Sequence, residues 1–432
     1  MLNLSKYRLP FFFSIVLFLI LATTLAVIYN RGYKIDFSKR ALKPTGILAI
    51  SSSPVGAKVY IDGELKTATN NTLTLVPGEY QIELKKPNFI SWQKKITIEK
   101  ELVTQLDAFL FPEVPDLKPL TFEGAENPQV SPDNSKIVYT VPLSVGKTAP
   151  QDKAGLWVVD LNDSLLGFSR EPRQIARSQK TLDFSQASFF WSPDSRQILV
   201  EFKSPSKFLL ADSNQFNQPA SLVDISSTLP LIISEWQKEN GLRQEARIKK
   251  LPLKLQEILF QSIGQFDFSA DGTKMLYTAT ASAEIPKILI PPVLAASTQK
   301  ESRKIEPNKV YVYDLKEDRN FLMPFELPKP TPTPKPSKTK TATPAQNLHQ
   351  LLTFNFELLT ISWFPTSRHL FWVEKDKVVA CEYDGTNTAT VYSGPFVFPS
   401  VFAPPGANKF MVLAKTNLDK DYQNNLYSVS LR

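Results

Sequence analysis

A short turn phrase recurs along this chain and limits what the chain can fold into. Ser131-Pro132-Asp133-Asn134, Ser192-Pro193-Asp194-Ser195 and Ser269-Ala270-Asp271-Gly272 share it, and weaker copies stand at residues 364–367 and 403–406. Proline presets φ for the second position of a type I turn, aspartate bonds its own backbone, and Gly, Asn or Ser tolerates the tight exit. Each copy therefore predicts a hairpin turn.

Strand-like runs flank every turn. An apolar or aromatic run precedes it, as at residues 189–191, a β-rich run follows, as at 198–200, and a third run ends at a polar residue, as at 310–314. Repeated units of three or four short strands predict the blades of a β-propeller. The last copy ends after its third strand, whereas a spare strand, 117–122, precedes the first copy. We expect that strand to complete the last blade, at residues 426–431, so that no sheet edge stays open.

The turn phrase also carries a family resemblance. Its position between the first two strands of each unit resembles the TolB-like and WD-type propeller repeats, over residues 113–432. The resemblance implies a mainly β chain ending in a five-bladed propeller, or a six-bladed one if an insertion hides a blade. It implies no particular activity, because propellers serve as scaffolds, binders and, less often, enzymes.

Two segments interrupt the expected propeller. Residues 229–262 carry apolar residues at helical spacing, which predicts two short inserted helices. Residues 328–347 are rich in Pro, Thr and Lys and favour an extended polyproline II segment. We expect this segment to project as a loop from one blade, between a third strand at 310–315 and a fourth at 351–354. We expect a spacer or disordered loop; the alternatives are a docking motif for a polyproline-binding partner and a site of surface glycosylation.

The N-terminus predicts a membrane anchor. Residues 9–29 are almost wholly apolar, and about 20 such residues at about 1.5 Å each span a hydrocarbon core about 30 Å thick. A cleaved signal peptide is the alternative, but the run is long and no small-residue cleavage site follows it. We expect residues 1–8 in the cytoplasm, 30–44 as a linker and the bulk of the chain outside the plasma membrane. The basic downstream flank argues for the reverse orientation.

Residues 45–112 predict a compact β module. Runs with a period of two alternate with turns at Asp62-Gly63 and Pro77-Gly78. The stretch 51–63, followed by 75–80, closely resembles the PEGA domain, whose namesake tetrapeptide falls on Pro54-Val55-Gly56-Ala57. Its later Gly-Tyr is replaced here by Asn88-Phe89. The resemblance implies a small β-sandwich-like module of bacterial and archaeal surface proteins, without enzymatic activity of its own.

Charge and cysteine content exclude some classes of protein. The net charge is +8, but seven basic residues against one acidic lie within residues 1–44, and four lysines lie within 328–347. A basic face on a folded domain, which nucleic-acid binding requires, is therefore not predicted. The single cysteine, Cys381, cannot form an internal disulfide.

Candidate catalytic and metal-binding groups are few. The two histidines, His349 and His369, and one cysteine are too few for the usual zinc sites, and no nucleophile elbow or phosphate loop occurs. Asn417–Asp421 has alternating oxygen ligands but lacks the glycine of a calcium loop. We assign no catalytic, cofactor or metal residues. A structural role is expected for the turn carboxylates and for three tryptophans between blades: Asp133, Asp194, Asp271, Trp191, Trp363 and Trp372.

These observations predict a single-pass membrane protein that presents a PEGA-like module and a propeller in the cell envelope. We expect a binding or scaffold protein, not an enzyme, with a protein or cell-wall polysaccharide as its partner and no cofactor. The alternatives are a propeller enzyme that processes glycans or peptides with carboxylates at its channel, and an adaptor that faces the cytoplasm.

Overall fold

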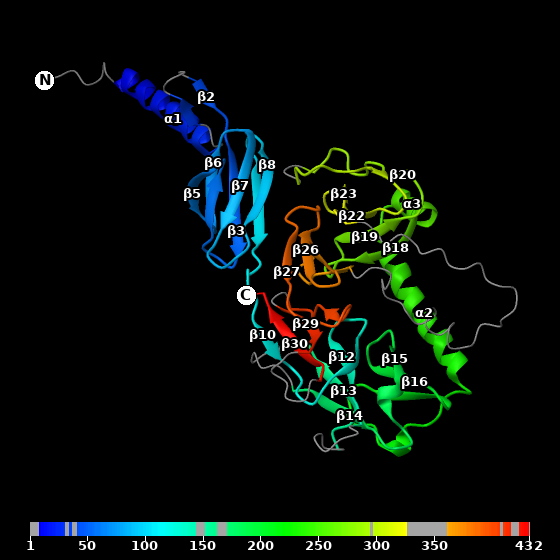
Figure 1. Ribbon diagram of the computed structural model, residues 1–432. Helices are drawn as coiled ribbons and strands as arrows, with labels where there is room; N and C mark the ends of the chain where they lie inside the picture. The colour runs from blue at the N-terminus through cyan, green and yellow to red at the C-terminus, as the bar shows by residue number, and fades with distance from the viewer. Residues whose placement is uncertain are drawn as a thin grey trace. The chain divides into compact units, whose positions relative to one another are not determined.

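The computed structural model describes nine stretches of the chain: 8–30, 34–36, 41–143, 152–161, 171–293, 297–325, 361–406, 409–415 with 423–431. It divides into two compact units (Figure 1). Unit 1 comprises Met1–Leu110 and Pro291–Lys300, and unit 2 comprises Phe111–Ile290 and Glu301–Arg432.

Unit 1 begins with one helix and a short hairpin. Helix α1 (Arg8–Asn30) has 23 residues and is followed by β1 (Lys34–Asp36) and β2 (Ala41–Lys43). Among the residues that the structure describes, no helix combines the length and apolarity that a bilayer crossing requires.

The rest of unit 1 is a sandwich of two sheets. One sheet has the order β6-β3-β9 and the other β5-β4-β7-β8. Their inner residues, such as Leu48, Val59 and Ile82, are fully buried in one core. The strands are β3 (Gly46–Ser53), β4 (Lys58–Ile61), β5 (Glu64–Ala68), β6 (Asn71–Leu75), β7 (Gly78–Lys85), β8 (Trp92–Ile98) and β9 (Val103–Phe109).

In its described residues, unit 2 contains five antiparallel sheets of three or four strands, numbered here I to V in chain order, and one two-stranded sheet. Sheet I holds β11 (Glu126–Val130), β12 (Lys136–Val141), β13 (Gly155–Asp160) and β14 (Arg173–Arg177). Sheet II holds β15 (Ala187–Trp191), β16 (Gln197–Lys203) and β17 (Ser206–Asp212). Sheet III holds β18 (Ile263–Phe268), β19 (Lys274–Ala279), β22 (Val310–Asp314) and β23 (Arg319–Leu322).

Sheets IV and V complete unit 2. Sheet IV holds β24 (Ile361–Trp363), β25 (His369–Val373), β26 (Val378–Glu382) and β27 (Ala389–Tyr392). Sheet V holds β28 (Val401–Phe402), β29 (Lys409–Ala414), β30 (Asn425–Ser430) and β10 (Leu117–Pro119). The helices α2 (Leu229–Ile248) and α3 (Leu253–Ser262) lie between sheets II and III in sequence, at the predicted insertion. A small hairpin joins β20 (Ala283–Glu284) to β21 (Lys304–Ile305).

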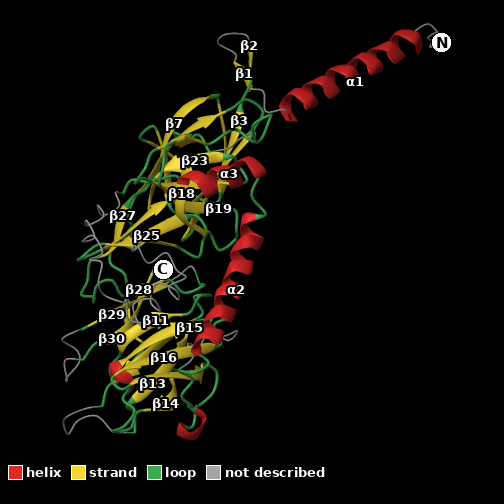
Figure 2. Cartoon of the chain, turned by 90° about the vertical axis from the view of Figure 1, so that its right-hand side faces the viewer, coloured by secondary structure: helices red, strands yellow, loops and turns green. Residues whose placement is uncertain are grey.

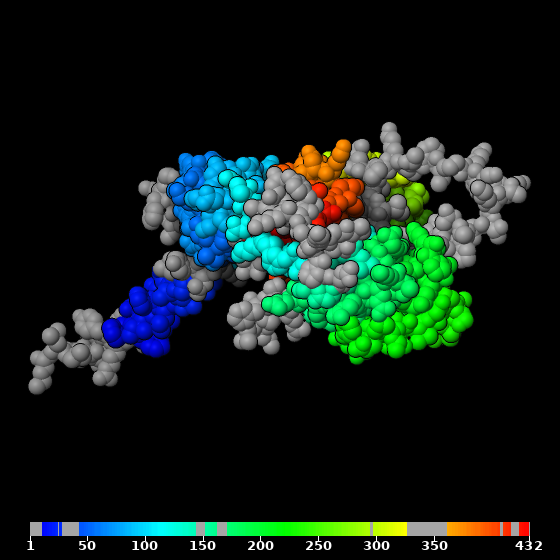
Figure 3. All heavy atoms as spheres, turned by 60° about the horizontal axis from the view of Figure 1, so that its bottom comes forward, coloured from blue at the N-terminus to red at the C-terminus, as the bar shows by residue number. Residues whose placement is uncertain are grey.

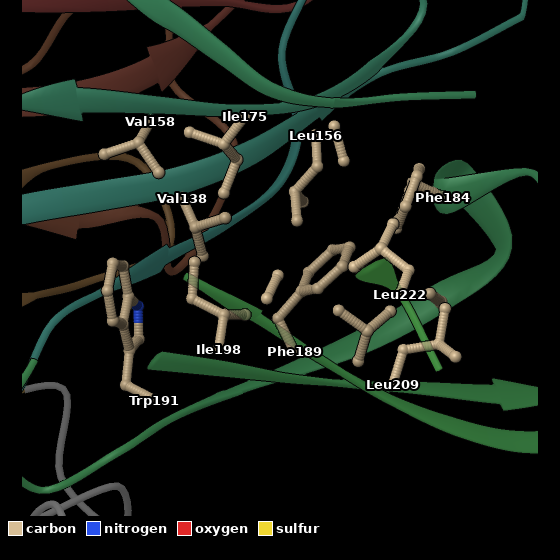
Figure 4. Close-up of a cluster of buried hydrophobic side chains, with 14 of the residues drawn as sticks. Val138, Leu156, Val158, Ile175, Phe184, Phe189, Trp191, Ile198, Leu209 and Leu222 are labelled. Carbon is tan, nitrogen blue, oxygen red and sulfur yellow. The ribbon is translucent and has the colours of Figure 1, made fainter. Parts of the chain in front are cut away.

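Each sheet buries both of its faces, because successive side chains point to opposite sides of a strand. In β16, Ile198 and Val200 pack toward sheet I, whereas Leu199 between them packs on the other side. Figure 4 shows the first of these cores, in which Val138 and Leu156 of sheet I face Ile198 and Phe189 of sheet II. A single sheet of this kind would expose two apolar faces, so neighbouring elements are needed to cover both.

Strands from the two ends of unit 2 share sheet V, as predicted. β10 pairs antiparallel with β30, with Leu117 opposite Val429 and Pro119 opposite Tyr427. Ser430 N donates to Asp116 O (2.8 Å) at one end of this pairing. Cyan β10 and red β30 accordingly lie side by side in Figures 1 and 3.

One strand assignment was wrong. The fourth strand of sheet III is β23 (Arg319–Leu322), which returns directly from β22 through a short turn where Asp318 has φ 51°. Sheet III therefore needs no strand from 351–354, and those residues and the 328–347 segment lie outside the described residues. The parallel pairing of β9 with β3 in unit 1 was also not predicted.

Candidate functional site: the turn rim

The repeated turns are closed by their own side chains. In the first three, the serine hydroxyl donates to the aspartate two residues later, at 2.6, 2.6 and 2.7 Å. The same serine oxygen accepts the backbone N–H five residues on, from Lys136, Gln197 and Lys274. The fourth residue of each turn has positive φ, which Asn134, Ser195 and Gly272 adopt. We call this set of turns the turn rim.

Hydrogen bonds keep the turn carboxylates ionised. Burial pushes the pKa of Asp133 upward, but donors from Ser131, Ser135 and Ser195 outweigh it and hold that pKa below its usual value. The pKa values of Asp194 and Asp271 are lowered in the same way, against burial, chiefly by hydrogen bonds within their own turns. Each carboxylate is thus used by its own turn, which agrees with a structural role.

The turn rim also connects neighbouring sheets. Asp133 N in sheet I donates to Ser195 Oγ in sheet II (3.3 Å), and Asp271 N in sheet III donates to Ser367 Oγ in sheet IV (3.0 Å). Both acceptors are the fourth residue of their turn. The same contact, from an aspartate N–H to a serine hydroxyl, therefore joins the turn of sheet I to that of sheet II and the turn of sheet III to that of sheet IV.

Two of the three tryptophans reinforce the same connections. Trp191 Nε1 donates to Gln129 O (3.1 Å), and Trp363 Nε1 donates to Asp267 O (3.3 Å). Both indoles are buried between sheets, as predicted. Trp372 is only partly buried against the core between sheets III and IV, and its Nε1 donates to Glu374 Oε1.

The remaining predicted candidates do not form a site in the described residues. His369 is buried, contacts Thr366 Oγ1 through Nδ1 (3.1 Å) and packs edge-on against Phe111. His349 and Asn417–Asp421 lie outside the described residues. Among the residues described, no group of three or more His, Cys, Asp or Glu is arranged to hold a metal ion. Cys381 is buried, and burial raises the pKa of its thiol.

Asp267 was not singled out from the sequence. It lies in β18 between Phe266 and Phe268, and burial raises the pKa of its carboxyl to about 6, although the charge of Arg247 opposes this. Strand alternation gave no signal of this burial, because Asp267 falls on the same side of the strand as the polar Gln265 and Ser269. The ionised form of the Asp267 carboxyl therefore lowers the stability of the folded protein.

We expect Asp267→Asn to stabilise the protein by about 1–2 kcal/mol above pH 7. A carboxyl with a raised pKa favours folding below its unfolded value of about 4, and this contribution is lost as the pH rises through about 6. The gain should accordingly shrink at pH 4.5. Urea denaturation at both pH values measures it. Asp271→Asn is the matched control, because the pKa of Asp271 is lowered and its replacement should destabilise the protein at pH 7. A gain from Asp267→Asn that is equal at both pH values would contradict the prediction.

This geometry defines a mainly β protein that joins a small β-sandwich to a series of two-faced, sequentially packed sheets. Residues 45–113 match the PEGA domain family, so the sandwich of unit 1 is a PEGA domain. No curated protein matches the sequence.

Solved structures that resemble the chain include β-propeller domains and TolB. The β-propeller domain of Cps50 (Swd1) from Myceliophteria thermophila is 10% identical, with 73% of this chain and 100% of that chain covered and a TM-score of 0.26. TolB from Acinetobacter baumannii is 11% identical over 80% of this chain and 53% of its own, with a TM-score of 0.17. The β-propeller domain of the Trilobed protease from Pyrococcus furiosus is 11% identical over 90% and 96%, with a TM-score of 0.19. These TM-scores are low, and the sheet assignments above rest on strand pairing alone.

Proposed function

We propose that this protein is a membrane-anchored scaffold whose unit 2 is a five-bladed propeller that binds a protein or an envelope polymer. The pairing of β10 with β30 is the observation that carries the proposal, because it places the two ends of unit 2 in one sheet. Sheets in sequence, each covered on both faces, form a platform on which loops can present a binding surface. The PEGA domain would serve as a spacer.

The anchor and the orientation are part of the same proposal. The apolar sequence of residues 9–29 supports a membrane-spanning segment, and the bulk of the chain would then lie outside the plasma membrane. A single-cysteine label can test this, because Cys381 is fully buried and should stay silent.

We expect Lys375→Cys, at an exposed residue, to react with a membrane-impermeant maleimide in intact spheroplasts that express the full chain. The unaltered chain, with only Cys381, is the control. Labelling that appears only after the spheroplasts are lysed would show that unit 2 faces the cytoplasm and would support the adaptor alternative.

Binding is tested with the full chain in detergent. Co-sedimentation with isolated peptidoglycan sacculi is expected if the partner is the wall polymer, and in-cell crosslinking to a defined envelope protein is expected otherwise. The sacculi should be recovered chemically unchanged. Release of soluble sugar or peptide fragments would overturn the scaffold proposal in favour of the enzyme.

A further inference from the structure

The joints between the sheets of unit 2 are unequal. Sheets I and II, and likewise sheets III and IV, are joined by a tryptophan indole and a serine hydroxyl at equivalent places. At those places sheet III has Phe268 in place of the tryptophan and Gly272 in place of the serine. Sheet III therefore has no such side chain to offer sheet II. We call the boundary between sheets II and III the seam.

Helices cover the apolar faces at the seam. Leu229, Ile233 and Trp236 of α2 pack on sheet II, in one core with Phe190, Leu199 and Phe208. Leu255 and Leu259 of α3 pack on sheet III, in one core with Met275, Tyr277 and Tyr311. The faces that two adjacent sheets would bury against each other are thus buried against different helices.

The other joints consist of direct packing between sheets. Met411 and Leu413 of sheet V share a core with Ile137 and Tyr139 of sheet I. Tyr392 of sheet IV packs edge-on against Phe410 of sheet V, with ring centroids 5.9 Å apart. The seam is therefore the joint at which helices replace a sheet-to-sheet core.

Helix α2 crosses the seam, and a stretch in its C-terminal half is unpacked. Figure 2 shows it running from the region of β15 and β16 toward that of β18 and α3. Its residues 241–247 are all exposed, so both faces of the helix meet solvent there. In this stretch, Arg243 Nη1 donates to Pro193 O of the turn rim (2.7 Å), and Arg243 also pairs with Glu239.

Gly241 lies at the start of this unpacked stretch. Glycine lowers helix stability by about 1 kcal/mol relative to alanine. A Cβ at this position would meet no atom within 4 Å, so close packing does not require glycine here. The glycine thus lowers the stability of the helix at the start of a stretch whose side chains are exposed.

We infer that the seam is the hinge of unit 2 and that α2, which spans it, controls how far sheets II and III separate. Sheets I and II would move as one piece and sheets III and IV as another. Rigid pieces joined by a few element-terminal or helical residues are the usual construction of a hinge. The packing supports the same division, because helices cover the facing sides of sheets II and III and residues 241–247 of α2 are exposed.

Paired spin labels on the full chain test the hinge. Lys203→Cys with Lys316→Cys places labels across the seam, and Lys316→Cys with Lys375→Cys places them within sheets III and IV; all three lysines are exposed. We expect the distance distribution across the seam to be about twice as broad as the other, because hinge motion widens only distances between the two pieces. Gly241→Ala should narrow the distribution across the seam and leave the matched pair unchanged.

Two outcomes would overturn the inference. One is a distribution across the seam no broader than that within sheets III and IV. The other is a broad distribution that Gly241→Ala does not narrow, since α2 would then not set the opening. Amide hydrogen exchange of the unlabelled protein gives an independent check: residues 241–247 should exchange faster than the packed half of α2 around Ile233 and Trp236.

Discussion

The Lys274→Met variant is expected to lose about 3 kcal/mol in its free energy of unfolding. Lys274 begins β19 and its side chain is 11% exposed, yet it is charged. Its Nζ lies 3.5 Å from Asp314 Oδ2, 3.2 Å from Thr273 Oγ1 and 4.6 Å from the centre of the Tyr383 ring in sheet IV. Methionine would fill the same space but leave the nearly buried carboxylate of Asp314 without this cation. Urea denaturation at pH 7 measures the loss.

Two further variants separate the charge from the packing. Lys136 is the matched residue in sheet I, and its Nζ donates to Ser213 Oγ (3.1 Å) and Asn214 Oδ1 (2.8 Å) of sheet II. Asp160, opposite Lys136 in the sheet, pairs with another cation, because Arg173 Nε lies 3.7 Å from Asp160 Oδ2. Lys136→Met should therefore cost only about 1 kcal/mol.

The double variant Lys274→Met/Asp314→Asn should recover much of the loss. Asparagine keeps an oxygen that can accept the N–H groups of Lys316 and Glu317, as Asp314 Oδ1 does now, while the buried charge is removed. Equal losses in the two single variants, or no recovery in the double variant, would show that the buried ion pair is not the cause.

The repeated sheets could be predicted because their signals are local. A Ser-x-Asp turn is closed by atoms within five residues, so the chemistry of Ser131 and Asp133 alone determines it. Strand alternation, also local, placed Trp191 and Trp363 in the cores between sheets. The pairing of β10 with β30 followed from counting strands: one strand was missing at the end and one was left over at the start.

Other features depend on partners that are distant in the sequence. Strand β23 is short and begins with the polar residues Arg319 and Asn320, so the sequence pattern does not indicate a strand there. Only its pairing with β22 identifies it. The importance of Lys274 depends on Tyr383, more than a hundred residues away. The pKa of Asp267 depends on burial by side chains of other strands. Local periodicity carries none of this information.

The Asn425→Leu variant is expected to unfold with a free energy about 2–4 kcal/mol lower than the wild type. Asn425 is buried in β30 and its Oδ1 accepts from Thr121 Oγ1 (3.0 Å) and Gly124 N (3.1 Å). Thr121 Oγ1 in turn accepts Leu426 N (2.9 Å). Leucine has a similar volume but no acceptor, so the buried amide of Gly124 and the hydroxyl of Thr121 would lose their partner. Thermal and urea denaturation both report the change.

A double-mutant cycle makes this a test of how the two ends of unit 2 are joined. Thr121 and Asn425 are 304 residues apart in sequence. Groups in one hydrogen-bond network couple by about 0.5–3 kcal/mol, whereas distant sites add independently. We expect Thr121→Val and Asn425→Leu to couple by at least about 1 kcal/mol, and Ser428→Ala, a half-exposed control in the same strand, to show no coupling to Thr121→Val. Additive effects of Thr121→Val and Asn425→Leu would mean that β10 does not pair with β30 in solution, and the proposed propeller would lose its closure.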